Sequence, residues 1–178
     1  MKNERCVFLK RYNGIDFYLF TPSLFTPYDD CYPGEDEPPY SRRAVHRARM
    51  MREWYKSKYR VVYMKVGSKT VGHFVVGRGG SRIAMSTPAD IVIGPVWTIP
   101  SERNKGYASR GIDFVLHYAG FVYANAYEYI KETNTPSIRT VEKNGFILAA
   151  RCREFGILRT IKEDENGDVL VFRYQASA

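Results

Sequence analysis

Cysteine is scarce in this sequence, and long apolar runs are absent. The three cysteines, Cys6, Cys31 and Cys152, are an odd number without a Cys-x-x-Cys pair, so neither a disulfide framework nor a zinc site is indicated. No apolar run reaches the roughly 18 residues that a membrane span needs, and no apolar leader follows Met1. We therefore expect a cytoplasmic protein with reduced thiols, no metal site and no membrane partner.

Acidic residues are nearly missing from one stretch of a basic chain. The net charge is +8, and residues 42–60 hold eight Arg or Lys against a single acid, Glu53. The rest of the chain is therefore close to neutral, which argues against a protein that coats nucleic acid. No RNA- or DNA-binding motif is present, so we expect no nucleic-acid partner, and binding of a polyanion by residues 42–60 is the alternative.

The common glycine motifs for nucleotides are absent as well. There is no GxxxxGK[ST], and no GxGxxG follows a strand. Instead, "SERNKGYASR" at 101–110 joins the strand-like run "DIVIGPVWTIP" to a helical pattern. The first amides of a helix have no intrahelical partner and, together with the helix dipole, attract anions. Gly106 permits close approach of the backbone, and Arg103 and Lys105 add positive charge, so this turn predicts a phosphate site.

The patterning predicts one domain over residues 1–178, with a mixed α/β sheet and helices on its faces. Asn13-Gly14 between two alternating runs indicates a hairpin. An acidic, proline-rich loop at 21–40 precedes a basic amphipathic helix at 41–59. The later elements are expected as two strands around Gly67-Ser68, a strand at 90–99, a helix with an apolar stripe from Ala108 to Ala119, a strand at 121–130, a helix from an N-cap at Thr135 to Gly145, and two final strands joined across Asn166-Gly167.

Two segments resemble the Gcn5-related N-acetyltransferase superfamily. "TIPSERNKGYAS" is similar to the acetyl-CoA-binding segment, a Val-x-Pro strand end followed by Arg/Gln-x-x-Gly-x-Gly/Ala. "NTPSIRTVEKNGF" is similar to the second block, an Asn, a small residue three positions later, and Glu-Lys-x-Gly-Phe. The two blocks occur in the family's order and spacing. The matching residues are Arg103, Gly106 and Ala108 in the first block, and Asn134, Ser137, Glu142, Lys143, Gly145 and Phe146 in the second.

The resemblance implies the acyl-CoA N-acyltransferase fold, a central, mostly antiparallel sheet with splayed strands and flanking helices. It implies acetyl-CoA as cofactor, a cofactor-binding core over about 90–150, and an acceptor-side segment over about 21–60. In this family the main chain of the turn holds the pyrophosphate, the preceding strand pairs with the pantetheine arm, and an asparagine lies near the thiol end. The implied cofactor-binding residues are Trp97, Thr98, Ile99, Arg103, Asn104, Lys105, Gly106, Tyr107, Ala108 and Asn134.

The catalytic groups depart from the family pattern. Many members carry a tyrosine that protonates the leaving thiolate, and Val141 stands at that position here. Ser137 is the first candidate for stabilising the thiolate, and a capping role for its hydroxyl is the alternative. An amine with a pKa near ~10 must lose a proton before it attacks. Asp90 and Glu128 are the candidate bases. His73, Tyr127 and Tyr129 are further ionisable groups that could face the cleft. Loss of the amine proton to water is another alternative.

The acceptor is less well defined by the sequence. The acidic loop would attract a cationic amine, whereas the basic helix and Gly77 to Arg82 would suit an acceptor that bears phosphate. The predicted function is transfer of acetyl from acetyl-CoA to a primary amine of a small molecule, such as an amino sugar, in a ternary complex. The alternatives are acetylation of a protein N-terminus or side chain, and non-catalytic binding of acyl-CoA. We expect a monomer or a homodimer.

Overall fold

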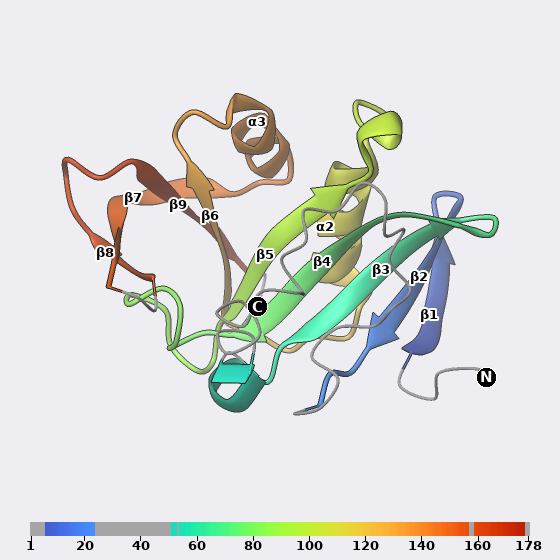
Figure 1. Cartoon of the computed structure of the whole chain (residues 1–178), viewed down its shortest axis with the longest axis horizontal. Coiled ribbons are helices and arrows are strands. Elements are labelled where there is room, and N and C mark those ends of the chain that lie inside the picture. The colour runs from blue at the N-terminus through green and yellow to red at the C-terminus, as the bar shows by residue number, and fades with distance from the viewer. Residues whose placement is uncertain (1–5, 24–50, 53, 157–158, 177–178) are drawn as a thin grey trace.

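A computed structural model describes residues 6–23, 51–52, 54–156 and 159–176. One nine-stranded sheet, in the order β1-β2-β3-β4-β5-β6-β9-β7-β8, forms the body of the molecule (Figure 1). The strands are β1 (Cys6–Tyr12), β2 (Ile15–Phe20), β3 (Arg60–Val66), β4 (Lys69–Arg78), β5 (Ile91–Thr98), β6 (Asn125–Lys131), β7 (Ile147–Phe155), β8 (Thr160–Glu163) and β9 (Val169–Gln175). The helices with described bounds are η2 (Pro100–Glu102), α2 (Tyr107–His117) and α3 (Thr135–Lys143). The predicted mixed, mostly antiparallel sheet with flanking helices is confirmed.

The sheet divides where β5 meets β6. These two strands are parallel and pair only at Ile91↔Ala126 and Val92↔Tyr127. Beyond Val92, β5 remains paired with β4 as far as Thr98, while β6 remains paired with β9 along its whole length. The strands therefore diverge, and Figure 1 shows the opening between them. We call this divergence the fork.

A bulge bends β5 just beyond the fork. Val76 pairs with Ile93 and Phe74 with Val96, so the single residue Val75 of β4 lies opposite two residues of β5, Gly94 and Pro95. A bulge of this kind turns the strand and leaves one residue out of the ladder. The edge of β5 that faces the fork therefore carries backbone groups that β6 does not pair.

The main core lies between the sheet and the two helices. The stripe of α2 buries Ile112, Phe114 and Val115, and α3 contributes Val141 to the same cluster. A Cβ added at Gly111 would lie 2.1 Å from Cζ of Phe74, so α2 approaches β4 closely only because this residue has no side chain. Two smaller clusters, around Ile83 and around Tyr59, occupy the opposite side. The packing fixes the start of α2 beside the end of β5.

Several predicted boundaries were wrong. The strand expected at 121–130 begins at Asn125, because Tyr123 leaves the sheet plane and donates a hydrogen bond to the carbonyl oxygen of Leu116 in α2, at 2.9 Å. The expected final hairpin contains an additional strand, β8, which pairs with β7, and β9 pairs with β7 on its other edge. The helix expected at 41–59 ends by Ser57. Its beginning and the acidic loop lie outside the described residues from 24 to 50.

Candidate active site

The turn after β5 ends in an exposed helix start. Asn104 and Gly106 have positive φ angles of 61° and 77°, and Gly106 is the N-cap of α2. No side chain of the described part of the chain caps this end. The amides of Tyr107, Ala108 and Ser109 meet no acceptor among the described residues, as expected for the first turn of a helix. Three N–H groups therefore point out of the helix end, where an anion can bind.

The start of α3 lies across from this turn. Asn134, the N-cap, accepts a hydrogen bond from the amide of Ser137 at 3.4 Å, so the N-cap predicted at Thr135 was wrong by one residue. The side-chain Nδ2 of Asn144, at the other end of α3, donates to Oγ of Ser109 at 3.0 Å and thereby ties α3 to α2. The two helix starts are held on either side of one opening.

That opening is a cleft of about 750 Å³. Its walls are the end of β5, the turn that follows, and the starts of α2 and α3. Nine of the residues that the sequence analysis assigned to cofactor binding or catalysis line it together: Trp97, Thr98, Arg103, Asn104, Gly106, Tyr107, Ala108, Asn134 and Ser137. Segments that are about 30 residues apart in the sequence therefore meet in one cleft.

Two of the named residues, Ile99 and Lys105, are not among those that line the cleft. The side chain of Ile99 is buried, and its amide donates to the carbonyl oxygen of Val71 at 3.0 Å. Nζ of Lys105 pairs with Glu102 at 2.9 Å. Glu102 also pairs with Lys69 at 2.7 Å, and hydrogen bonds from Lys69 and Lys105 lower the pKa of the Glu102 carboxyl. Lys105 thus fixes the conformation of the turn with its side chain.

The cleft also contains positive charge to which the sequence analysis gave no binding role: Lys143 was named only as part of the second block, and Arg139 was not named. Arg139 and Lys143 of α3 line the cleft, and both are exposed. They are four residues apart, so they lie on one face of the helix together with Pro136 and Thr140. The sequence could have predicted that Arg139 and Lys143 lie together, because residues four apart on a helix share a face.

Ser137 carries an unused hydroxyl at the edge of the cleft. Asn134 provides the side-chain cap of α3, and the Ser137 hydroxyl makes no hydrogen bond to another described residue. The capping alternative for this hydroxyl is therefore not what the geometry shows. The other cleft hydroxyl of α3, on Thr140, donates to the carbonyl oxygen of Pro136 at 2.8 Å.

Asp90 lies outside the cleft and is fully engaged. Its carboxylate accepts from the amide and hydroxyl of Thr87, both at 2.8 Å, and from the amide and side chain of Asn125, at 3.0 and 2.8 Å. Burial raises the pKa of Asp90, but these four hydrogen bonds outweigh it, and the pKa is lowered overall. The contacts join the loop before β5 to the first residue of β6, so they hold the base of the fork.

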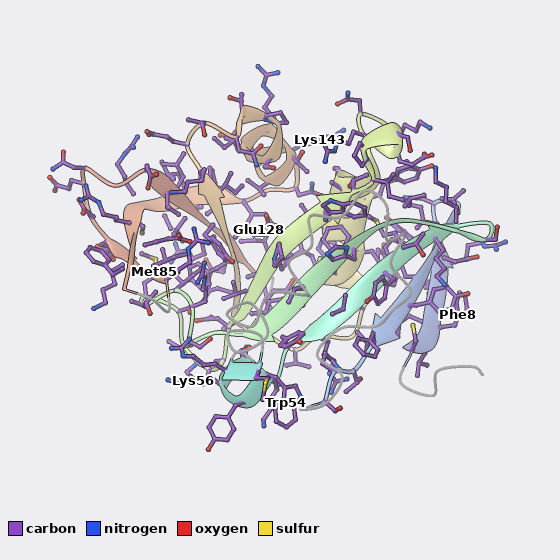
Figure 2. The ribbon with its side chains drawn as sticks, viewed as in Figure 1. Phe8, Trp54, Lys56, Met85, Glu128 and Lys143 are labelled. Carbon is purple, nitrogen blue, oxygen red and sulfur yellow. The ribbon has the colours of Figure 1, made fainter. Side chains whose placement is uncertain are left out.

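Glu128 is buried one residue beyond the last β5–β6 pair. Figure 2 shows it between β6 and β5. The residue is 5% exposed, and its Oε1 has no hydrogen-bond partner among the described residues. Burial raises the pKa of the carboxyl from 4.5 to about 8. At neutral pH, Glu128 therefore carries its proton.

The remaining ionisable candidates lie on the other face of the sheet. Burial lowers the pKa of His73 to about 3, so the ring is neutral, and it stacks on Trp97 with 5.5 Å between centroids. Tyr127 is buried in the cluster around Ile83. Tyr129 borders a second cavity, described next.

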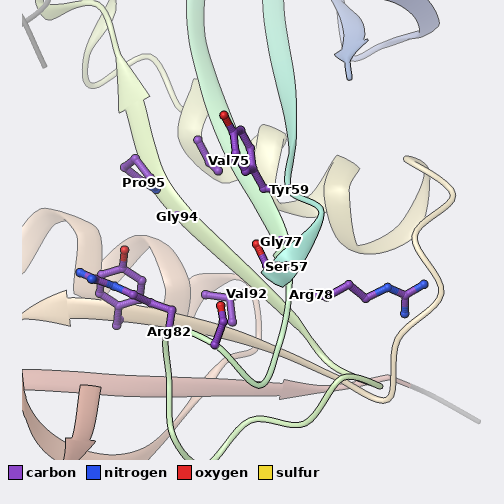
Figure 3. A pocket seen from close by; sticks show the side chains of 11 residues that line it. Ser57, Tyr59, Val75, Gly77, Arg78, Arg82, Val92, Gly94 and Pro95 are labelled. Carbon is purple, nitrogen blue, oxygen red and sulfur yellow. The ribbon is translucent and has the colours of Figure 1, made fainter. Parts of the chain in front are cut away.

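The second cavity has a volume of about 50 Å³ and lies at the fork, on the side away from α2 and α3. Gly94 and Pro95 of β5 form one wall, and Ser57 and Tyr59 form another (Figure 3). Arg82 also borders it, but its guanidinium pairs with Glu154 at 2.8 Å and lies over the Tyr129 ring. The fork thus has a large cleft on one side and a small cavity on the other.

Among the described residues, no helix is long and apolar enough to cross a membrane. In the same part of the chain, no three His, Cys, Asp or Glu side chains gather closely enough to hold a metal ion.

Comparison with known protein families identifies one family. The sequence model described as "Acetyltransferase (GNAT) family" matches residues 22–146. No curated protein matches the chain.

Solved structures resemble the fold at low sequence identity. A protein described as an acetyltransferase of the GNAT family from Desulfovibrio desulfuricans aligns with a TM-score of 0.59 at 13% identity, over 92% of this chain and 99% of that chain. The microcin C7 self-immunity acetyltransferase MccE, in complex with acetyl-CoA and AMP, aligns with a TM-score of 0.56 at 16% identity, over 92% and 93%. The ribosomal-protein-S18-alanine N-acetyltransferase of Escherichia coli gives 0.50 at 12% identity, over 67% and 70%. At these identities the likeness is one of fold.

Proposed function

The chain belongs to the acetyltransferase (GNAT) family, whose members use acetyl-CoA, and we propose that it acetylates the primary amine of a small molecule, such as an amino sugar, in a ternary complex. The observation that carries this proposal is the meeting of both sequence blocks in one cleft at the fork. When bound, acetyl-CoA supplies an activated acetyl thioester. The chain's own residues would bind and orient the thioester and stabilise the sulfur as it leaves.

The donor set of the cleft fits the diphosphate of coenzyme A. The free amides of Tyr107, Ala108 and Ser109 are aimed outward at the N-terminus of α2. Arg139 and Lys143 supply positive charge from the opposite wall. A volume of about 750 Å³ lies within the range of cofactor and ligand sites, roughly 300–1,000 Å³.

The free edge of β5 fits the extended arm of the cofactor. Beyond Val92 this edge pairs with no strand among the described residues, so its N–H and C=O groups are available to an extended ligand with amides of its own. Trp97 and Thr98 of this strand line the cleft. An arm that paired here would lead from the turn toward the fork.

The small cavity supports a small acceptor group. A water molecule occupies about 10–15 Å³ on the same measure, so about 50 Å³ admits a group of only a few heavy atoms. Ser57 and Tyr59 border it and belong to the acceptor-side segment expected from the sequence. An amine entering from this side would approach the fork from the face opposite the cleft.

The proton of the amine is assigned to water rather than to Asp90. The four hydrogen bonds of Asp90 hold its carboxylate in the fold and away from the cleft. Its lowered pKa also makes it a weak base. An amine that attacks from the side of the small cavity can instead release its proton to solvent. Ser137 is the group that we propose to stabilise the sulfur as it leaves.

Acetylation of a protein N-terminus is the second candidate. It is favoured by the free Ser137 hydroxyl at the cleft and by the fold likeness to an enzyme named for the alanine of a ribosomal protein. A small cavity admits an N-terminal amino group as readily as a small molecule. A peptide would additionally need an open groove leading to it.

Calorimetric titration of the purified chain with acetyl-CoA tests the proposal first. Release of free thiol is then measured against a panel of small amines and short peptides. Binding with release on a small amine is the expected result, and release on peptides alone would favour the second candidate. Binding without release on any acceptor would indicate a non-catalytic acyl-CoA domain. Failure to bind would overturn the proposal.

Replacement of Ser137 tests its role separately. Ser137→Ala should lower kcat about tenfold and leave the affinity for acetyl-CoA unchanged, because the hydroxyl is needed only as charge develops on sulfur. Thr140→Val is the matched control, since its hydroxyl is bonded within α3 and should not affect turnover. If Ser137→Ala and Thr140→Val have the same kcat, the Ser137 hydroxyl does not stabilise the leaving sulfur.

A further inference from the structure

This inference rests on the proposed function and concerns a buried acid that it does not explain. Glu128 lies at the fork with one carboxyl oxygen unpaired among the described residues. A buried polar group without a partner destabilises a fold, so an apolar residue would be the better choice if Glu128 served only the core. Glu128 follows the Val92↔Tyr127 pair directly, so it lies at the point where β5 leaves β6 (Figure 2).

The groups around Glu128 are apolar. Ala126 and Ile130 flank it on its own face of β6, and Phe172 of β9 is opposite in the register. Ile93 of β5 and Val141 of α3 belong to the same cluster.

Tyr174 of β9, which pairs with Ala126, is the titratable residue that shares this face of the sheet. The other charged and titratable groups described on these elements point elsewhere. Tyr127 and Tyr129 alternate with Glu128 on the other face of β6, and Arg173 of β9 does the same beside Phe172. Arg139 and Lys143 of α3 are exposed in the cleft. Burial alone shifts the carboxyl, with no neighbouring charge contributing. Glu128 is therefore a neutral acid at pH 7 and a hydrogen-bond donor.

We propose that Glu128 is the proton donor for the leaving sulfur of coenzyme A. The residue that α3 contributes to this cluster is Val141, which has no proton to give. A thiol titrates near ~8.5, close to the value for Glu128, so proton transfer between them meets no large uphill step. The assignment changes the expected role of Glu128 from base to acid.

The protons balance in this scheme. The amine nitrogen forms a bond to the acetyl carbon as the carbon–sulfur bond breaks and its electron pair moves to sulfur. Glu128 gives its proton to that sulfur, which leaves as the thiol. The nitrogen releases one proton to water, and the Glu128 carboxylate takes one back from water as coenzyme A departs.

The affinity for acetyl-CoA at pH 7 and pH 9, measured by calorimetry, tests the contact without any acceptor. Acetyl-CoA has no free thiol, so a change over this range reports groups of the protein. At pH 9 the carboxyl is about ten parts ionised to one part neutral, and the loss of the donor should weaken binding about tenfold. Glu128→Gln keeps a donor that does not ionise, so its affinity should not change with pH. Glu163→Gln, at an exposed position of β8 that does not line the cleft, should behave like the parent chain.

The outcomes separate this inference from the function on which it rests. If the parent chain and Glu128→Gln show the same pH dependence, Glu128 does not contact the thioester and the inference fails, while acetyl-CoA binding stands. If the folded parent chain does not bind acetyl-CoA at either pH, the proposed function fails first. Should Glu128→Gln not fold, Glu128→Leu provides the same comparison with an apolar side chain. With an amine found in the panel, Glu128→Gln should lower kcat and leave KM unchanged.

Discussion

At the residue scale, the conformation of Gly106 matters more than its small volume. An added Cβ would have nothing within 4 Å, but its φ of 77° is one that other residues adopt at a cost of about 1–2 kcal/mol. Gly106→Ala should therefore relax the turn, redirect the amides of α2, and lower the affinity for acetyl-CoA about tenfold. Calorimetry and thermal unfolding measure the two effects.

Gly120 provides the matched control for that prediction. It has a similar φ of 74°, also with open space around an added Cβ, but it follows α2 at its far end from the cleft. Gly120→Ala should lose about the same stability and keep the parent affinity for acetyl-CoA. An equal loss of affinity in both variants would show that the effect comes from general destabilisation and not from the turn.

At the scale of elements, α3 adds the charge that β5 and α2 do not supply. The double substitution of Arg139 and Lys143 to Gln should weaken acetyl-CoA binding about tenfold, because charge-assisted hydrogen bonds to phosphate are lost. The remaining affinity should depend less on salt, since screening acts on the charges removed. Titrations at two salt concentrations measure this. Lys162→Gln on β8, outside the cleft, is the control, and an equal effect there would contradict the assignment.

Local patterns predicted the elements of the site better than they predicted the edge of the sheet. The turn at Gly106 and the start of α3 near Asn134 depend on capping and glycine geometry, which are local and readable. The strand β8 was missed because residues 146–158 read as one strand, whereas β7 ends at Phe155 and Gly156, with a φ of 66°, follows it. Tyr123 continues an alternating pattern but packs against α2, so tertiary contact overrides the pattern.

The environment of Glu128 was beyond the reach of sequence analysis. Alternation showed that it shares a face with Ala126 and Ile130. It did not show that β5 turns away at this level, or that no partner faces the carboxyl, because both depend on strands that are distant in sequence. The sequence could name Glu128 as an ionisable candidate, whereas its role as an acid requires the packed fold.

At the scale of the whole molecule, the fork lies between two openings, one on each side of the sheet. The cleft opens between α2 and α3, and the small cavity opens on the other side of the sheet. The bonds of Asp90 fix the closed end of the fork, and the bulge at Gly94-Pro95 bends its β5 arm. Two ligands can therefore reach the fork from opposite sides without crossing, as a ternary complex requires.

Two buried groups also make the stability of the whole fold depend on pH, with opposite signs. His73 has its pKa lowered to about 3, so the unfolded chain binds the extra proton as the pH falls from 6.5 toward 3, and stability is lost in that direction. Glu128 has its pKa raised from 4.5 to about 8, so its contribution is fully present below 4.5 and is lost as the pH rises toward 8. The two contributions oppose each other between about pH 4.5 and 6.5.

Replacement of Glu128 by Leu isolates its part of this balance, because His73 remains in both chains. Between pH 5 and 8 the unfolded parent releases the Glu128 proton while the folded parent keeps it. The free energy of unfolding of the parent should therefore fall relative to Glu128→Leu by up to about 1.4 kcal/mol for each pH unit. Denaturant titrations at pH 5, 6, 7 and 8 measure the difference, which should widen steadily in favour of the variant. A difference that stays constant over this range would mean that the carboxyl ionises normally in the folded chain, and a neutral acid at the fork would then be excluded.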